Sequence, residues 1–223
     1  MNYERKPAQI YRLSFSRVRQ EADLSRYTRS QADVAVRIIH ACGMVGLGTE
    51  LEFSGGFETA GRDALLRGAP IHCDGKMTAA GIIRRSLPAQ NRIVVTVDSH
   101  ETTELANKLE TTRSAAAVDA WTSELEGSVV AIGNAPTALF RLLEIVDGGG
   151  PSPALVIGFP VGFVGAAESK AALAARRRRF EYITLPGTKG GSAMAAAAVN
   201  AIALACGRNP DAEPPEGAGG VGG

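Results

Sequence analysis

The chain has 223 residues, which is enough for one α/β domain with a sizeable hydrophobic core. Its 45% apolar and 21% charged content are ordinary for a globular protein, while a net charge of +1 and 5% aromatic content do not favour a nucleic-acid partner. The polar N-terminus lacks the apolar core of a signal peptide, and the alanine-rich run at 193–205 is too short to span a bilayer. We therefore expect a cytoplasmic protein without a membrane or nucleic-acid partner.

The three cysteines, Cys42, Cys73 and Cys206, are widely spaced and follow no Cys-x-x-Cys or Cys/His ligand pattern. We expect them to be small buried apolar side chains in a reducing compartment, and we expect no metal site. The last stretch, 207–223, is rich in glycine, proline and acid and has almost nothing to bury. It is predicted to be a disordered tail after a single domain over 1–206.

The first half of the chain alternates between helical and strand patterns. Helices are predicted over 10–22, 30–42, 57–67 and 76–85, and strands over 69–73 and 92–97. The second helix starts with a capping-box pattern at 30–33 and should end at Gly43. Asp74 is predicted to cap the fourth helix.

After two more predicted helices, 102–109 and 114–125, a strand, a glycine-rich turn and a helix follow one another three times. The three strands are predicted over 129–132, 154–157 and 182–185. Pro136 suits the first turn of its helix, because its missing N–H would have no partner there. This alternation predicts an α/β fold: three layers, with a mainly parallel sheet covered by helices on both faces.

The three glycine-rich turns lie at strand C-terminal ends, the edge at which open α/β sheets bind ligands. The turn at Gly133 and Asn134 should leave free backbone N–H groups that suit an anion. No turn matches GxGxxG, and in GTKGGS (187–192) the lysine precedes the glycine pair, unlike a Walker A motif. The turns together indicate a ligand with several anionic groups; alternatively, they are merely tight connections.

Three histidines are present. His72 lies inside a predicted strand, as a core or rim residue, and His100 lies in a turn and should be exposed. His40 follows Arg37 by one helical turn. It is either a surface histidine near a helix end or a general acid and base, a role that suits histidine near neutral pH. The four arginines at 176–179 are best explained as a solvated turn or an interface.

Six segments form a distinctive set, namely RIIHACG (37–43), CDGKM (73–77), TRSAAA (112–117), VVAIGNAPTALF (129–140), GFPVGFVGAAESK (158–170) and GTKGGSAMAAAAVNA (187–201). Together they resemble the precorrin-8X methylmutase family of cobalamin biosynthesis, over nearly the whole chain from about residue 10 to 205. The resemblance implies an isomerase that moves a methyl group from carbon 11 to carbon 12 of precorrin-8X and forms hydrogenobyrinate. It also implies a homodimer of α/β fold that needs no metal or organic cofactor.

The resemblance further implies that His40 is the catalytic histidine, which gives a proton to the substrate and recovers it. The remaining positions are expected to bind a flat macrocycle rimmed with carboxylates. They are Tyr11, Ser14, Arg17, Arg37, Met77, Arg113, Asn134, Pro136, Thr137, Gly162, Phe163, Lys189, Gly190, Gly191 and Ser192. Phe159 and Val161 are further candidates for apolar walls.

Three alternatives stay open at this point. The natural substrate could be the cobalt-containing precursor, cobalt-precorrin-8. The protein could instead act mainly as a corrinoid carrier that holds the product and hands it to a neighbouring enzyme of the pathway, because a site complementary to the macrocycle also binds product. The third alternative is an α/β enzyme that binds a phosphate-containing ligand. The absence of a Walker or Rossmann motif disfavours this alternative.

Overall fold

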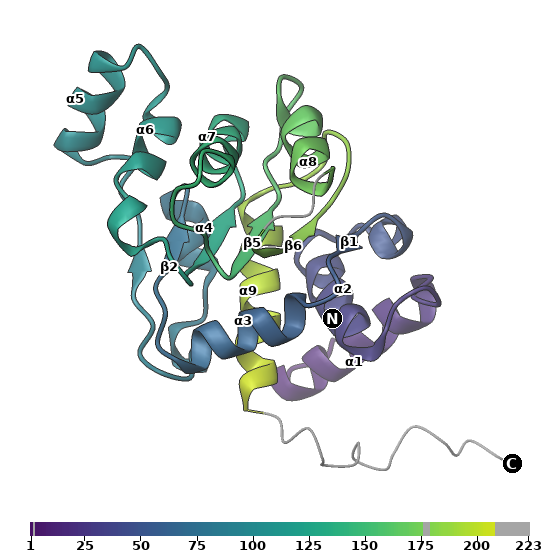
Figure 1. The fold of residues 1–223 in the computed structure, drawn as a ribbon. Helices are drawn as coiled ribbons and strands as arrows, with labels where there is room; N and C mark the ends of the chain where they lie inside the picture. Colours follow the sequence, from purple (N-terminus) through teal and green to yellow (C-terminus); the bar gives the residue numbers. More distant parts are fainter. Residues whose placement is uncertain (2, 176–178, 208–223) are drawn as a thin grey trace, which may run out of the picture.

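The computed structural model describes residues 1, 3–175 and 179–207. A six-stranded sheet lies between two layers of helices (Figure 1). The strands are β1 (Glu52–Phe53), β2 (Ile71–Cys73), β3 (Ile93–Val94), β4 (Val129–Ile132), β5 (Leu155–Gly158) and β6 (Glu181–Thr184). Their order is β1-β6-β5-β4-β2-β3, and all pairs are parallel except β1 with β6. The predicted α/β class, with a mainly parallel sheet between helical layers, is confirmed.

The helices are α1 (Pro7–Glu21), α2 (Arg29–Cys42), α3 (Phe57–Leu66), α4 (Lys76–Gly81), α5 (His100–Lys108), α6 (Arg113–Asp119), α7 (Pro136–Asp147), α8 (Ala166–Ala174) and α9 (Ser192–Cys206). Short 3-10 turns follow α2, α4 and α6, at Val45–Thr49, Arg84–Ser86 and Thr122–Glu124. α2, α3 and α9 supply the core on one face of the sheet, and α6, α7 and α8 supply the core on the other. Helix α1 lies outside this arrangement, against α2.

Alternate residues of β4 enter opposite cores. Val129 and Ala131 pack with α9, whereas Val130 and Ile132 pack with α7. Successive strand side chains point to opposite faces, so a strand covered on both sides must be apolar at every position. This geometry explains the continuous apolar run that identified β4 in the sequence.

Several predicted boundaries are wrong by a few residues. Helix α2 begins earlier than predicted, because Thr28 rather than Ser30 caps it and forms the capping box with Gln31. It ends as predicted at Gly43, which adopts the left-handed conformation with φ of 72°. Strand β1 was not predicted at all: it has two residues and pairs only at the edge of the sheet. Helices α4 and α6 end short of their predicted limits, and each is continued by a 3-10 turn.

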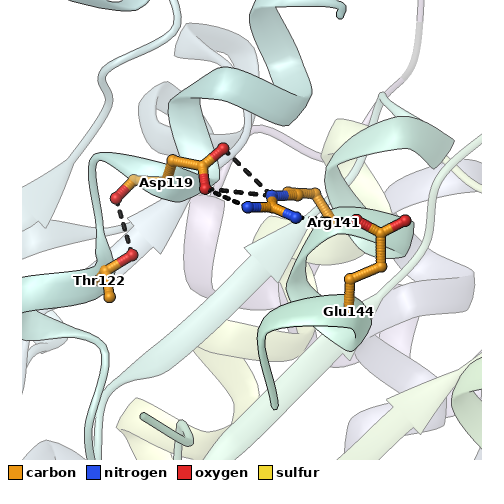
Figure 2. A network of polar contacts seen from close by, with 4 residues as sticks. All are labelled: Asp119, Thr122, Arg141 and Glu144. Atoms are coloured by element: carbon orange, nitrogen blue, oxygen red, sulfur yellow. Dashed lines mark hydrogen bonds and ion pairs between the residues drawn. The ribbon is translucent and has the colours of Figure 1, made fainter. Parts of the chain in front are cut away.

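Helix α6, which begins with Arg113, is held against α7 by a polar network (Figure 2). The Arg141 guanidinium on α7 donates to both carboxylate oxygens of Asp119, at 2.6–3.1 Å, and to Glu144 at 3.0 Å. These two carboxylates raise the pKa of Arg141. Thr122 closes the network by donating to the Asp119 carbonyl at 2.7 Å. A bidentate arginine fixes orientation as well as distance, so α6 is set firmly on α7.

Other expectations are met in part. Cys73 is buried, whereas Cys42 and Cys206 are half-buried, and all three are free thiols. Within residues 1, 3–175 and 179–207, none of the helices combines the length and the apolar character that crossing a bilayer requires. The predicted tail beyond residue 207, and positions 176–178 of the arginine run, lie outside the described residues. Arg179 donates to the Gly150 carbonyl at 2.6 Å.

His72 is a buried core residue, one of the two interpretations that the sequence left open. Its ring stacks on Trp121, with centroids 5.3 Å apart. Nε2 lies 3.3 Å from the Glu124 carbonyl, while Nδ1 has no hydrogen-bond partner among the described residues. Burial lowers the pKa of His72 below its ordinary value of 6.5, so the folded state holds the ring neutral.

The lowered pKa of His72 predicts acid sensitivity. As pH falls through about 6.5, the unfolded chain takes up a proton that the folded core rejects, so the free energy of unfolding must fall. The variant His72→Phe lacks the imidazole. Between pH 7.5 and 5.5 its free energy of unfolding should fall by less than that of the wild type. Urea unfolding followed by the fluorescence of Trp121 measures both. His100→Gln, at an exposed histidine, is the control and should keep the wild-type slope; identical slopes for all three proteins would contradict the prediction.

Candidate functional site

A pocket of about 260 Å³ opens between α1, α2, α4 and α9. It is lined by Tyr11, Arg37, His40, Ala41, Gly81, Ile83, Ala193, Ala196, Ala197 and Asn200. Three residues expected to form the site therefore meet here, although Tyr11 is distant in sequence from the other two. The alanines of α9 leave room for the pocket because their side chains end at Cβ.

His40 is held by one face of α1. Its Nδ1 lies 2.8 Å from the Ser14 hydroxyl, and its ring contacts the rings of Tyr11 and Phe15, at centroid distances of 5.7 and 4.9 Å. Residues 11, 14 and 15 share a helix face, because positions three and four apart lie side by side. His40 itself is exposed, so its ring is both oriented and accessible.

Arg37 shares the pocket with His40. It lies one turn earlier on α2, and its guanidinium stands over the Phe15 ring at 5.1 Å from the centroid. Such cation–π contact holds the planar head of an arginine without removing its charge. Arg17 is exposed on α1, one turn beyond Ser14. The pocket therefore places an imidazole beside a positively charged guanidinium.

Asn200 forms part of the pocket and was not singled out in the sequence. Its side chain accepts from the Ile83 amide at 2.8 Å and donates to the Gly81 carbonyl at 2.9 Å. A Cβ on Gly81 would stand 2.7 Å from that of Ala196, so α4 and α9 approach as closely as their side chains allow. The feature of the sequence that could have identified Asn200 is its amide side chain, which lies within a mostly apolar helix.

The three glycine-rich loops meet as one rim. The Val161 amide donates to the Asn134 carbonyl at 3.4 Å, the Gly162 amide to Thr188 at 3.2 Å, and the Gly191 amide to Phe159 at 2.9 Å. The rim carries the predicted positions Asn134, Pro136, Thr137, Gly162, Phe163, Lys189, Gly190, Gly191 and Ser192. Ser192 is followed by Ala193 of the pocket wall, so rim and pocket are continuous.

Asp74 occupies the point where the strand order reverses. β2 lies between β3 and β4, so a crevice is expected at its C-terminal end. The buried Asp74 carboxylate fills it and accepts from the amides of Gly133, Asn134 and Ala135, at 3.0, 2.8 and 2.8 Å. The predicted free N–H groups at the start of α7 are therefore wrong: an internal anion already binds them. The predicted cap on α4 is also wrong, since Gly75 is its N-cap residue.

Other predicted positions lie outside the pocket lining of the described chain. Met77 and Phe163 are 79% and 95% exposed, respectively. Arg113 lies 3.6 Å from Asp98, and Lys189 forms an ion pair with Glu50 at 2.7 Å. The prediction of Phe159 as an apolar wall is wrong, because its side chain is fully buried in the core under α9, while Val161 is exposed on the rim.

Fold and pocket together define an α/β enzyme with a histidine and an arginine side by side. A family model described as precorrin-8X methylmutase matches residues 9–205. The chain is 54% identical to the precorrin-8X methylmutase of Pseudomonas aeruginosa over 203 residues, which cover 91% of this chain and 98% of that one. The cobalt-precorrin-8 methylmutase of Priestia megaterium is 36% identical over 199 residues, covering 89% and 88% of the two chains. The chain belongs to the precorrin-8X methylmutase family and is an isomerase.

A solved structure supports the same assignment. The precorrin-8X methyl mutase from Thermus thermophilus superposes with a TM-score of 0.81 at 35% sequence identity, covering 89% of this chain and 96% of that one. A third relative, the precorrin-8X methylmutase of Sinorhizobium sp., is 50% identical over 202 residues, covering 91% and 96% of the two chains. The resemblance inferred from the six sequence segments is thereby confirmed at the level of family and fold.

The role of Asp74 gives a stability prediction. Asp74→Asn places an NH₂ group where three backbone donors converge, and should lower the free energy of unfolding by about 2–4 kcal/mol. Urea unfolding followed by Trp121 fluorescence provides the measurement. Asp63→Asn, an exposed carboxylate on α3, is the matched control and should change stability by less than about 0.5 kcal/mol. Equal losses in the two variants would show that the Asp74 carboxylate has no special place in the fold.

Proposed function

We propose that this chain converts precorrin-8X to hydrogenobyrinate by moving a methyl group from carbon 11 to carbon 12, in the pocket around His40. The observation that carries the proposal is His40 itself, oriented by Ser14 and open to a ligand beside Arg37. The metal-free substrate is supported by the relatives, since two named precorrin-8X methylmutases are 54% and 50% identical. The relatives named cobalt-precorrin-8 methylmutases are 31–42% identical.

In the proposed mechanism Ser14 engages Nδ1 of His40, so proton exchange with the substrate falls to Nε2. His40 gives its proton to a nitrogen of the macrocycle, which draws electron density from the ring and favours migration of the methyl group. The shift is sigmatropic and needs no nucleophile, and His40 recovers the proton afterwards. General acid catalysis of this kind contributes about 10²–10⁴-fold, and holding the ring in a reactive shape contributes further.

The substrate extends beyond the pocket in this proposal. A pocket of about 260 Å³ lies below the usual range for drug-sized ligands, about 300–1,000 Å³, and the macrocycle with its side chains is larger. The rim loops therefore bind the remainder. Positive side chains suit the carboxylates; those proposed are Arg17, Arg37, Arg113 and Lys189. Tyr11, Met77 and Phe163 offer apolar surface to the faces of the ring.

We also infer a homodimer of single-domain subunits in the cytoplasm. Helix α1 supports the dimer, because none of its residues is buried and Ile10 and Leu13 are exposed. An amphipathic helix with an uncovered apolar face is typical of an interface. Light scattering after gel filtration should give twice the mass of one chain. Leu13→Glu should give a monomer, and an unchanged mass would exclude this face.

The role of His40 is tested by His40→Ala. Turnover of precorrin-8X should fall by at least about 10²-fold, while binding of hydrogenobyrinate is kept, because the variant loses the proton donor and little contact surface. Product formation is followed by absorbance and product binding by titration. His100→Ala, at an exposed histidine on α5, should retain full turnover. If His40→Ala lost binding and turnover together, a purely catalytic role for His40 would be excluded.

The substrate itself is tested with the wild-type protein. Mixing it with precorrin-8X under low oxygen should turn the solution from pale yellow towards orange, because migration of the methyl group extends the conjugated system. A colour change with the cobalt form alone would assign the protein to the cobalt-containing route. Product that binds and co-elutes without any turnover would favour the corrinoid carrier instead.

A further inference from the structure

Helix α8 carries a buried lysine under the rim. Lys170 is 1% exposed and lies one turn before Leu173, on the side of α8 that packs against the sheet. Its ammonium donates to the Lys189 carbonyl at 2.5 Å, in the loop between β6 and α9. Within the described residues this is the one hydrogen bond of the Lys170 side chain.

Within residues 1, 3–175 and 179–207, this buried ammonium has no counter-ion. Burial lowers the pKa of Lys170 to about 8, and among the described residues no charged neighbour contributes to the shift. Three charged side chains on elements near α8 have other partners: Arg141 of α7 contacts Asp119 and Glu144, Glu181 of β6 contacts the Gly56 amide, and Lys189 contacts Glu50. Burying a charge is unfavourable because the charge loses its hydration, so an apolar residue would stabilise this position better. The lysine therefore indicates a role other than stability.

The bond from Lys170 orients one peptide unit. The carbonyl of Lys189 and the N–H of Gly190 belong to the same planar trans peptide and point in opposite directions. Since Lys170 holds the carbonyl inward, the Gly190 N–H is directed away from the core. Within the described part of the chain, no acceptor meets this N–H.

Two neighbouring contacts keep this peptide in place. A Cβ on Gly190 would stand 2.4 Å from the Phe159 carbonyl oxygen, so only glycine fits between the loops. The Gly191 amide donates to that same oxygen at 2.9 Å. The Lys170 ammonium also polarises the peptide, which strengthens the Gly190 N–H as a donor.

We propose that Lys170 is a positioning residue for the substrate: it aims the Gly190 N–H at one carboxylate on the rim of the macrocycle. The inference rests on the proposed function, because the carboxylate belongs to the proposed substrate. It adds a role for a buried side chain that does not itself touch the ligand. It also gives the third glycine-rich loop an anion-binding group, which the first loop lacks because Asp74 fills it.

The test is Lys170→Met, which keeps the length and volume of the side chain and removes its charge. The dissociation constant for hydrogenobyrinate should rise about 10-fold, and KM for precorrin-8X should rise more than kcat falls. The melting temperature should stay equal or increase, because the buried charge is gone. Lys108→Met, at an exposed lysine of α5, is the matched control and should bind as the wild type does.

A second readout needs no ligand. The ¹⁵N shift of the Gly190 amide should titrate with a midpoint of about 8 in the wild type and stay flat in Lys170→Met. The affinity of the wild type for hydrogenobyrinate should weaken as the pH rises through this range. The affinity of Lys170→Met should not change. Unchanged product affinity in Lys170→Met, or weaker affinity together with a lower melting temperature, would overturn the inference. A wild-type protein in which Gly190 titrates but hydrogenobyrinate does not bind would instead overturn the proposed function.

Discussion

The carboxylate of Asp74 holds together the two strands between which an α/β sheet of this order would otherwise open. It follows β2 and accepts three amides of the loop after β4, at 2.8–3.0 Å. Each of these amides would be an unpaired donor at the start of α7 without it. The crevice that binds ligands in many open sheets is therefore closed by the protein itself. The candidate pocket lies instead on one side, between α2 and α9.

The position of the pocket between α2 and α9 determines which elements line it. The α2–α9 face contributes small side chains from α9, and α1 contributes the residues that orient His40. Asn200, which lines the pocket, ties the end of α4 to α9 through the Ile83 amide and the Gly81 carbonyl. The rim loops continue the pocket at Ser192. The proposed ligand would thus meet the pocket at one end and the Gly190 amide of the rim at the other.

Two buried charged side chains, Asp74 and Lys170, have opposite effects on the hydrogen-bond donors of the rim loops. Asp74 satisfies the donors of one loop and removes them from ligand binding, whereas Lys170 satisfies an acceptor of another loop and turns a donor outward. Both side chains are almost completely buried. Buried charges need defined partners, so each fixes its loop more narrowly than apolar packing would.

The sequence by itself determined the class of fold, because strands covered on both faces are apolar throughout and the glycine turns punctuate them. It also determined the family, through six segments that span the chain, and it marked His40. Only the tertiary structure decided that the Ser14 hydroxyl contacts Nδ1 of His40, since the two residues are 26 positions apart and no local pattern links them. The backbone amides that donate to Asp74 lie 59–61 positions away, and the carbonyl that accepts from Lys170 lies 19 positions away. Contacts of this range depend on strand order and helix packing, which periodicity and turn chemistry do not encode.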